Sequence, residues 1–185
     1  MSLLPILGLC ATMVATSFLS GLFGMAGGLV LIGVLLFVLP LPAAMALHAI
    51  TQIASNVWRA VLWRRHIRVP VAAAYAAGCL AALGIWSLWR FVPEPAAALL
   101  FLGVVPFLAR LVPERWRPVP ENRVHGVVFG MLCMTLMLLT GVAGPVLDRF
   151  FLDGRLDRRE IVATKGACQI FGHGAKLLYF GGIVA

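Results

Sequence analysis

Apolar residues occupy long runs along this chain, each about as long as a helix needs to cross a lipid bilayer. Four of these runs predict continuous helices: residues 43–63, 69–89, 94–111 and 161–180. Alternating segments of about ten residues, which would indicate a closed β-barrel, do not occur in the sequence. The pattern therefore predicts an all-α, polytopic helical membrane protein.

Glycines break the two remaining apolar stretches, residues 1–39 and 124–152. The first break has the sequence Gly-Leu-Phe-Gly-Met-Ala-Gly-Gly at residues 21–28, and the second has Gly-Val-Ala-Gly-Pro at residues 141–145. Clustered glycines weaken a continuous helix and let the backbone turn or be approached closely. Each stretch is therefore predicted to form a broken helical hairpin, in which a helix is followed by a shorter arm.

A stripe of polar residues runs along one face of the helix predicted at residues 43–63. Its members follow helical spacing: His48, Thr51, Gln52, Ser55, Asn56 and Arg59. Polar groups inside a membrane span are costly, so the stripe indicates a functional site. Helix-to-helix hydrogen bonding is the alternative interpretation, and we favour it for Ser55.

The stripe recurs after a shift of 117 positions without a gap, and the glycine break recurs with it. The second copy reads Lys165, Cys168, Gln169, Gly172, His173 and Lys176. Arginines follow the first copy at residues 64–68 but precede the second copy at residues 155–159. Since cytoplasmic loops are enriched in Lys and Arg, the two copies point in opposite directions across the membrane. We therefore predict inverted-topology repeats at residues 1–111 and 124–185, joined by a linker at residues 112–123, with the site at their interface.

Composition supports a membrane location and narrows the chemistry. Hydrophobic residues make up 62% of the chain and charged residues only 12%. The net charge of +8 arises mainly from arginines in short connections, so we interpret it as a topology signal and expect no nucleic-acid partner. Four cysteines form no CxxC pair, and the sequence lacks hydrolase and phosphate-loop motifs. We therefore expect no enzyme activity, no cofactor and no bound metal.

The breaks and stripes together suggest a site for a small anion. Helix N-termini carry partial positive charge, so arms starting at Gly27–Gly28 and at Gly144 are suited to bind an anion, although small residues also permit close packing. Lys165 would neutralise the anion unless it snorkels to the interface, and the glutamines would orient it. The predicted substrate-binding residues are His48, Thr51, Gln52, Asn56, Lys165, Cys168, Gln169, His173, Gly27, Gly28 and Gly144.

Two further roles are assigned to charged or titratable residues. Histidine is the side chain that ordinarily titrates near neutral pH, and Asp148 lies in the second arm, so His48 and Asp148 are candidates for proton coupling. A neutral, hydrogen-bonding His48 is an equally good interpretation, and Asp148 could also pair with Lys165. Arg59 and Lys176 lie near opposite ends of their helices and are interpreted as interfacial anchors.

The glycine segment at residues 21–28, the Pro-Leu-Pro break at residues 40–42 and the following stripe resemble the TauE/SafE family of sulfite and sulfonate exporters. Residues 140–181 are similar to the second repeat of that family. The resemblance implies a multi-pass transporter of small sulfur-containing or other organic anions in a bacterial inner membrane. It implies a small anionic substrate and a lipid bilayer as partners, and no enzyme activity.

Two departures from the family pattern bear on this interpretation. The position of Gly28 in the first copy is occupied by Pro145 in the second copy, so the two arms need not bind the substrate in the same way. The chain also stops at Ala185, before counterparts of residues 69–112. We expect that surface to lie further along a longer chain, to be supplied by another chain, or to be left open, for example to the partner in a homodimer. The alternatives to a transporter are a non-transporting membrane subunit or assembly factor, and a membrane metal or redox protein using Cys168 and the histidines.

Overall fold

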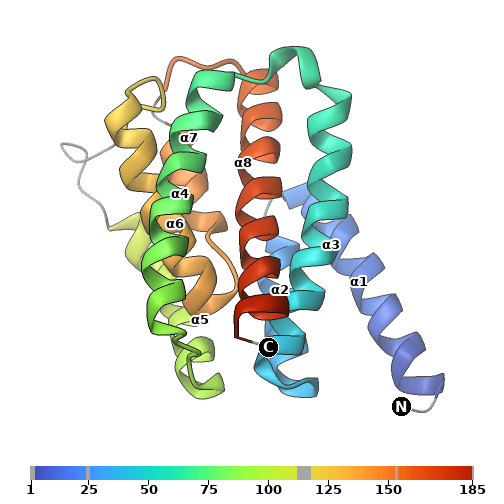
Figure 1. Ribbon diagram of the computed structural model, residues 1–185. Helices are drawn as coiled ribbons and strands as arrows, with labels where there is room; N and C mark the ends of the chain where they lie inside the picture. The colour runs from blue at the N-terminus through green and yellow to red at the C-terminus, as the bar shows by residue number, and fades with distance from the viewer. Residues whose placement is uncertain (1–2, 24–25, 112–117, 153, 185) are drawn as a thin grey trace.

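A computed structural model describes residues 3–23, 26–111, 118–152 and 154–184. These residues form eight α-helices and no strand, which confirms the predicted all-α class (Figure 1). The helices are α1 (Leu3–Phe23), α2 (Ala26–Val38), α3 (Leu41–Leu62), α4 (Val69–Trp89), α5 (Pro95–Arg110), α6 (Arg123–Thr140), α7 (Gly144–Leu152) and α8 (Arg158–Leu178). Short helical turns lie at Arg64–His66 and Tyr179–Ile183.

Local sequence chemistry explains where several of these helices begin. Proline stands in the first turn of α3, α4 and α5, where its missing N–H costs nothing. Asn122 caps α6 by accepting hydrogen bonds from the backbone of Val124 and His125. Asp157 and Glu160 form a capping box at α8. The helix therefore begins three residues before residue 161, the start that the apolar run predicted, because the capping box lets charged residues form its first turn.

The two glycine breaks produce two helical hairpins, as the sequence predicted. Figure 1 shows α2 returning towards the end of the molecule where α1 begins, and α7 returning towards the opposite end, where α6 begins. Gly141 closes α6 in the left-handed conformation, with φ of +86°, and lets the chain turn into α7. Gly24 lies outside the described residues. The hairpins thus enter from opposite ends, the arrangement that inverted repeats require.

The two helices that carry the polar stripes lie side by side and run antiparallel. In Figure 1, α3 runs upwards and α8 runs downwards beside it. Both arginine-rich segments consequently lie at one end of the molecule, where Arg68 pairs with Glu160 at 2.5 Å. The backbone N–H of Arg68 also donates to the Thr164 hydroxyl at 2.9 Å. Clustering of arginines at one end is the distribution that cytoplasmic segments show.

Helices α4 and α6 pack so closely that their backbones touch. A methyl group added at Gly78 would collide with the Val127 carbonyl oxygen, and one at Gly130 would collide with the Tyr75 carbonyl oxygen. Gly126 likewise faces Ala74. Small residues at helix contacts are typical of membrane proteins, where association depends on close packing.

The outward surface of the described residues suits lipid. Large apolar side chains such as Phe37 and Leu88 are more than 80% exposed. By length and apolar composition, α4 and α6 qualify as membrane spans, and shorter apolar helices lie at Ile6–Gly21, Ala26–Val38 and Pro95–Ala109. Helices α3 and α8, of 22 and 21 residues, are long enough to span the bilayer, but their polar stripes reduce their apolar content. Those stripes face the protein interior.

Candidate functional site

A small polar cavity lies where the two hairpins meet the two stripe helices. Its volume is about 10 Å³, the scale of one water molecule. Four parts of the fold supply its walls: the start of α2, the middle of α3, the break between α6 and α7, and the middle of α8. The lining residues are Gly28, Leu29, His48, Gln52, Val142, Ala143, Gly144, Gln169 and His173.

The antiparallel packing of α3 and α8 explains why both stripes reach this cavity. Gln52 and Gln169 occupy the same position in the two sequence copies, and both are buried and line the cavity. His48 lies one turn before Gln52, and His173 lies one turn after Gln169. In an antiparallel pair these offsets bring the two histidines to the same level.

His48 holds the start of α2 in place. Its Nε2 donates a hydrogen bond to the Gly28 carbonyl oxygen at 3.0 Å. Its Nδ1 lies 2.8 Å from the Lys176 Nζ, which donates to it. Since Nδ1 accepts while Nε2 donates, the surroundings assign the neutral Nε2–H tautomer to this ring. The neutral hydrogen-bonding role is therefore the one that this geometry displays.

Lys176 is completely buried, and this corrects its interpretation as an interfacial anchor. Besides His48, its Nζ donates to the Gly141 carbonyl oxygen at 2.8 Å. These bonds form a chain that runs from Gly28 through His48 and Lys176 to Gly141. The chain joins the start of the first arm to the break in the second hairpin.

His173 stands beside His48 with its ring edge against that ring. The ring centroids are 5.4 Å apart and the ring planes meet at 65°. The side chain is buried, and its Nδ1 has no hydrogen-bond partner among the described residues. Because His173 also lines the cavity, we expect this nitrogen to be within reach of a molecule bound there.

The glycines predicted at the first break have separate roles. Gly28 faces the cavity, and a Cβ at this position would lie 3.3 Å from the side-chain amide of Gln52. Gly27 faces the other way, where a Cβ would meet the Thr16 carbonyl oxygen and Ser20 of α1. Gly28 therefore leaves room beside the amide, whereas Gly27 permits close packing of the hairpin.

The first turns of two helices contribute to the cavity. Gly28 lies in the first turn of α2, and Gly144 is the first residue of α7. Backbone N–H groups in a first turn lack intrahelical partners and favour negative charge. Both cavity-facing helix starts belong to the hairpins, so each hairpin brings a partial positive charge to the same space.

Three other predicted site residues do not line the cavity. The Thr51 hydroxyl donates to the Leu47 carbonyl oxygen at 3.0 Å, within its own helix. Asn56 is buried and donates to the Gln52 carbonyl oxygen at 2.9 Å, and Cys168 is buried in the core. Thr51 and Asn56 therefore bond to the backbone of α3, and Asn56 supports the segment that carries Gln52.

Lys165 lies away from the cavity and forms an ion pair with Asp148. The two side chains are 19% and 42% exposed, so the pair is only partly buried. This pairing is the alternative role that the sequence left open for Asp148. Of the two candidates for proton coupling, only His48 borders the cavity.

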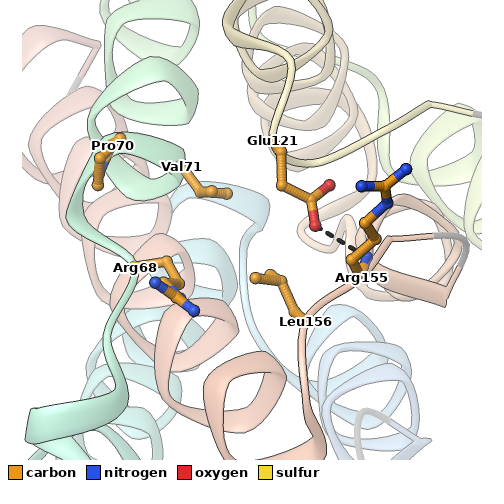
Figure 2. A pocket seen from close by; sticks show the side chains of 6 residues that line it. All are labelled: Arg68, Pro70, Val71, Glu121, Arg155 and Leu156. Carbon is orange, nitrogen blue, oxygen red and sulfur yellow. Dashed lines mark hydrogen bonds between the residues drawn. The ribbon is translucent and has the colours of Figure 1, made fainter.

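A second, larger pocket opens at the arginine-rich end of the molecule (Figure 2). It has a volume of about 370 Å³. Figure 2 shows Arg68 and Arg155 on opposite sides, with Val71 and Leu156 between them. The Arg155 backbone N–H donates to the Glu121 carboxylate at 2.8 Å, which fixes the connection between α7 and α8 against the start of α6.

Paired hairpins that enter from opposite ends, and a polar cavity between antiparallel helices, are features of a helical membrane protein and are typical of secondary transporters. The family model described as "Sulfite exporter TauE/SafE" matches residues 9–185. The chain belongs to this family, which confirms the resemblance found in the sequence. It is therefore a membrane transporter of sulfur-containing anions in the general sense that defines the family. Searches of curated proteins and of solved structures returned no match.

Proposed function

We propose that this protein exports a small sulfur-containing anion, such as sulfite or an alkyl sulfonate, across the inner membrane of a bacterial cell. The observation that carries the proposal is the cavity, because its walls come from both hairpins and both stripe helices. A site built from both repeats near the middle of the membrane is the usual arrangement in secondary transporters of this architecture.

The cavity supplies groups suited to such an anion. The first turns of α2 and α7 bring positive partial charge, and Gln52 and Gln169 bring amide N–H donors. No aspartate or glutamate lines the cavity among the described residues. A bound oxyanion would therefore meet donors without a competing negative charge.

The mechanism that we propose is alternating access, in which the structure described here is the intermediate state with the cavity closed to both sides of the membrane. Its volume of about 10 Å³ suits one water molecule, whereas sulfite is larger. Binding must therefore be accompanied by movement of the walls. The hairpins enter from opposite ends, so displacement of the first would open the cavity to one side and displacement of the second to the other.

The arginine-rich pocket would be the first site that a cytoplasmic anion meets. Arg68 and Arg155 frame this pocket on the side that the arginine distribution assigns to the cytoplasm. Glu121 also lines the pocket and Arg68 pairs with Glu160, so Arg155 is the arginine of the lining that would attract an anion, since positive charge at an opening raises the local concentration of anions. The pocket thus supports export from the cytoplasm as the direction of transport.

Efflux from proteoliposomes loaded with sulfite or methanesulfonate tests the proposed function. Gln169→Ala should reduce efflux about tenfold or more, because it removes a polar wall of the cavity. Thr51→Val is the matched control, since Thr51 bonds only to its own helix backbone, and it should keep near-normal efflux. Equal efflux from wild type and Gln169→Ala would show that the substrate does not pass through the cavity.

Proton coupling through His48 is a further part of the proposal. His48 borders the cavity, and a proton added at its Nδ1 would remove the acceptor that Lys176 uses, whereas the Nε2–H bond to the Gly28 carbonyl oxygen would persist. Efflux should therefore respond to an imposed pH gradient. Efflux that is the same with and without a gradient would exclude the coupling.

A further inference from the structure

We propose that Lys176 supplies the positive charge by which the central cavity selects anions, through its hydrogen bond to the His48 ring. The inference rests on the proposed function, because it assigns the charge-selecting residue of the same site. Lys176 differs from Lys165, which the sequence analysis named as the neutralising lysine. Of the two lysines on α8, Lys176 is the one linked by a hydrogen bond to a residue of the cavity wall.

The surroundings of Lys176 suit an ammonium group. Its Nζ donates to the His48 Nδ1 and to the Gly141 carbonyl oxygen, each at 2.8 Å, and both partners are acceptors. An ammonium carries three N–H donors, so these two acceptors leave one further donor. No carboxylate forms an ion pair with Lys176 in the described parts of the chain. An anion bound in the cavity would therefore be the partner that stabilises the protonated, positively charged form of this buried amine.

The position of Lys176 lets that charge act on the cavity. The amine touches one nitrogen of the His48 ring, and this ring forms part of the cavity wall. Charges separated by one side chain interact strongly when water is excluded, because the effective dielectric constant is low. An anion in the cavity would offset the buried charge, whereas a neutral molecule of the same shape would not.

The Asp148 carboxylate does not cancel this effect. Asp148 already pairs with Lys165 at a partly exposed position, on the side of the cavity that faces the arginine-rich end. The groups that line the cavity beside His48 are amides, an imidazole and helix starts, all uncharged or partly positive. Among the residues described here, Lys176 is thus the group linked to this wall that carries a full positive charge when it is protonated.

The test measures binding of two ligands that share size and shape but differ in charge. Methanesulfonate is an anion, and dimethyl sulfone is its neutral counterpart. Purified full-length protein in detergent should be stabilised against thermal unfolding by methanesulfonate and much less by dimethyl sulfone. Lys176→Met should weaken methanesulfonate binding at least about tenfold while leaving the response to dimethyl sulfone unchanged.

Two further variants separate charge from structure. Lys176→Arg keeps the positive charge and should keep the preference for methanesulfonate over dimethyl sulfone. The double variant Lys165→Met with Asp148→Asn removes a complete ion pair involving the other lysine of α8, and it should bind methanesulfonate as the wild type does.

Unchanged methanesulfonate binding in Lys176→Met would overturn the proposal. If that variant does not fold, Lys176→Gln takes its place with the same expected loss. A wild-type preference for the neutral sulfone would overturn the proposal without any variant.

The outcomes also separate this proposal from the proposed function. Normal sulfite efflux by Lys176→Met would keep the exporter and reject the role of Lys176. The opposite result is that the wild type binds acetate but no sulfur anion, and that Lys176→Met no longer binds acetate. This result would keep the role of Lys176 and reject the export of sulfur anions.

Discussion

The imidazole rings of His48 and His173 meet edge to face, with 5.4 Å between their centroids. One ring has both nitrogens engaged, whereas the Nδ1 of the other is buried without a partner among the described residues. The pair therefore combines a structural histidine that fixes the cavity wall with a second histidine whose polar edge is available to a bound molecule.

His173→Phe should separate these functions. Phenylalanine keeps an aromatic ring against His48 but removes both nitrogens, so we expect the fold to persist and sulfite efflux to fall several-fold. Efflux from proteoliposomes and thermal unfolding of the same preparation measure the two effects. Ser55→Ala, on the same stripe as His48 but outside the cavity lining, serves as the control and should behave as the wild type. Full activity in His173→Phe would limit that residue to packing.

Gly28→Ala should impair transport more than stability. The added Cβ would lie 3.3 Å from the Gln52 amide, so this side chain would have to shift within the cavity. Overpacking of this kind costs about 1–3 kcal/mol where the neighbour cannot move, and less where a side chain gives way. We expect efflux to fall several-fold with a small change in unfolding temperature.

Gly33→Ala is a matched control on the same helix. Its Cβ would find only a Leu102 methyl group, at 3.9 Å, so both efflux and stability should stay near wild type. Equal efflux from the two variants would show that the space beside Gln52 is not used.

Gly130→Ala should destabilise the fold itself. The new methyl group would collide with the Tyr75 carbonyl oxygen, which belongs to a helix backbone and has no rotamer by which to move away. We expect a loss of about 2–3 kcal/mol or more in the free energy of unfolding. Gly84→Ala on α4, where nothing lies within 4 Å of the added atom, should be neutral. Comparable thermal unfolding of both variants would contradict the close packing of α4 and α6.

The start of α8 should show a distinct dependence on pH. Hydrogen bonds from the backbone N–H groups of Glu160 and Arg159, and the nearby positive groups, lower the pKa of Asp157 below its ordinary value. A lowered pKa means that the ionised carboxylate stabilises the folded state at pH above the ordinary value, roughly 3.9, and that this contribution is lost as the pH falls through the lowered pKa.

Asp157→Asn provides the check on this dependence. Asparagine also caps a helix but does not titrate, so the variant should lose less of the α8 end on acidification. Amide hydrogen exchange at residues 158–161, compared between neutral and acidic pH, measures the effect once intrinsic exchange rates are corrected. An identical pH response in variant and wild type would exclude Asp157 as its source.

Sequence alone predicted much of the fold because the relevant forces are local or periodic. The lengths of the apolar runs gave the helices, the glycines gave the two breaks, and the reversed arginine flanks gave the opposite directions of α3 and α8. The same periodicity indicated that His48, Gln52, Gln169 and His173 would share a site, and the structure places all of them on one cavity.

The roles of the two lysines could not be predicted in the same way. By position along α8, Lys165 and Lys176 both resemble residues that reach an interface. Their difference comes from the neighbours that folding provides, since Lys165 meets Asp148 whereas Lys176 meets His48 and the Gly141 carbonyl oxygen. The Gly141 carbonyl is available only because this residue ends α6 in a left-handed conformation, which depends on the hairpin as a whole.

The bonded chain from Gly28 to Gly141 also bears on the kinetics of transport. The chain links the first arm to the second break through two side chains. An outward movement of one hairpin must therefore either break a buried hydrogen bond or move the other hairpin with it. In the proposed alternating-access cycle, opening of either hairpin must first break this tie, so the tie favours the state in which both hairpins are closed. We therefore expect the bonded chain to slow the opening step of the cycle.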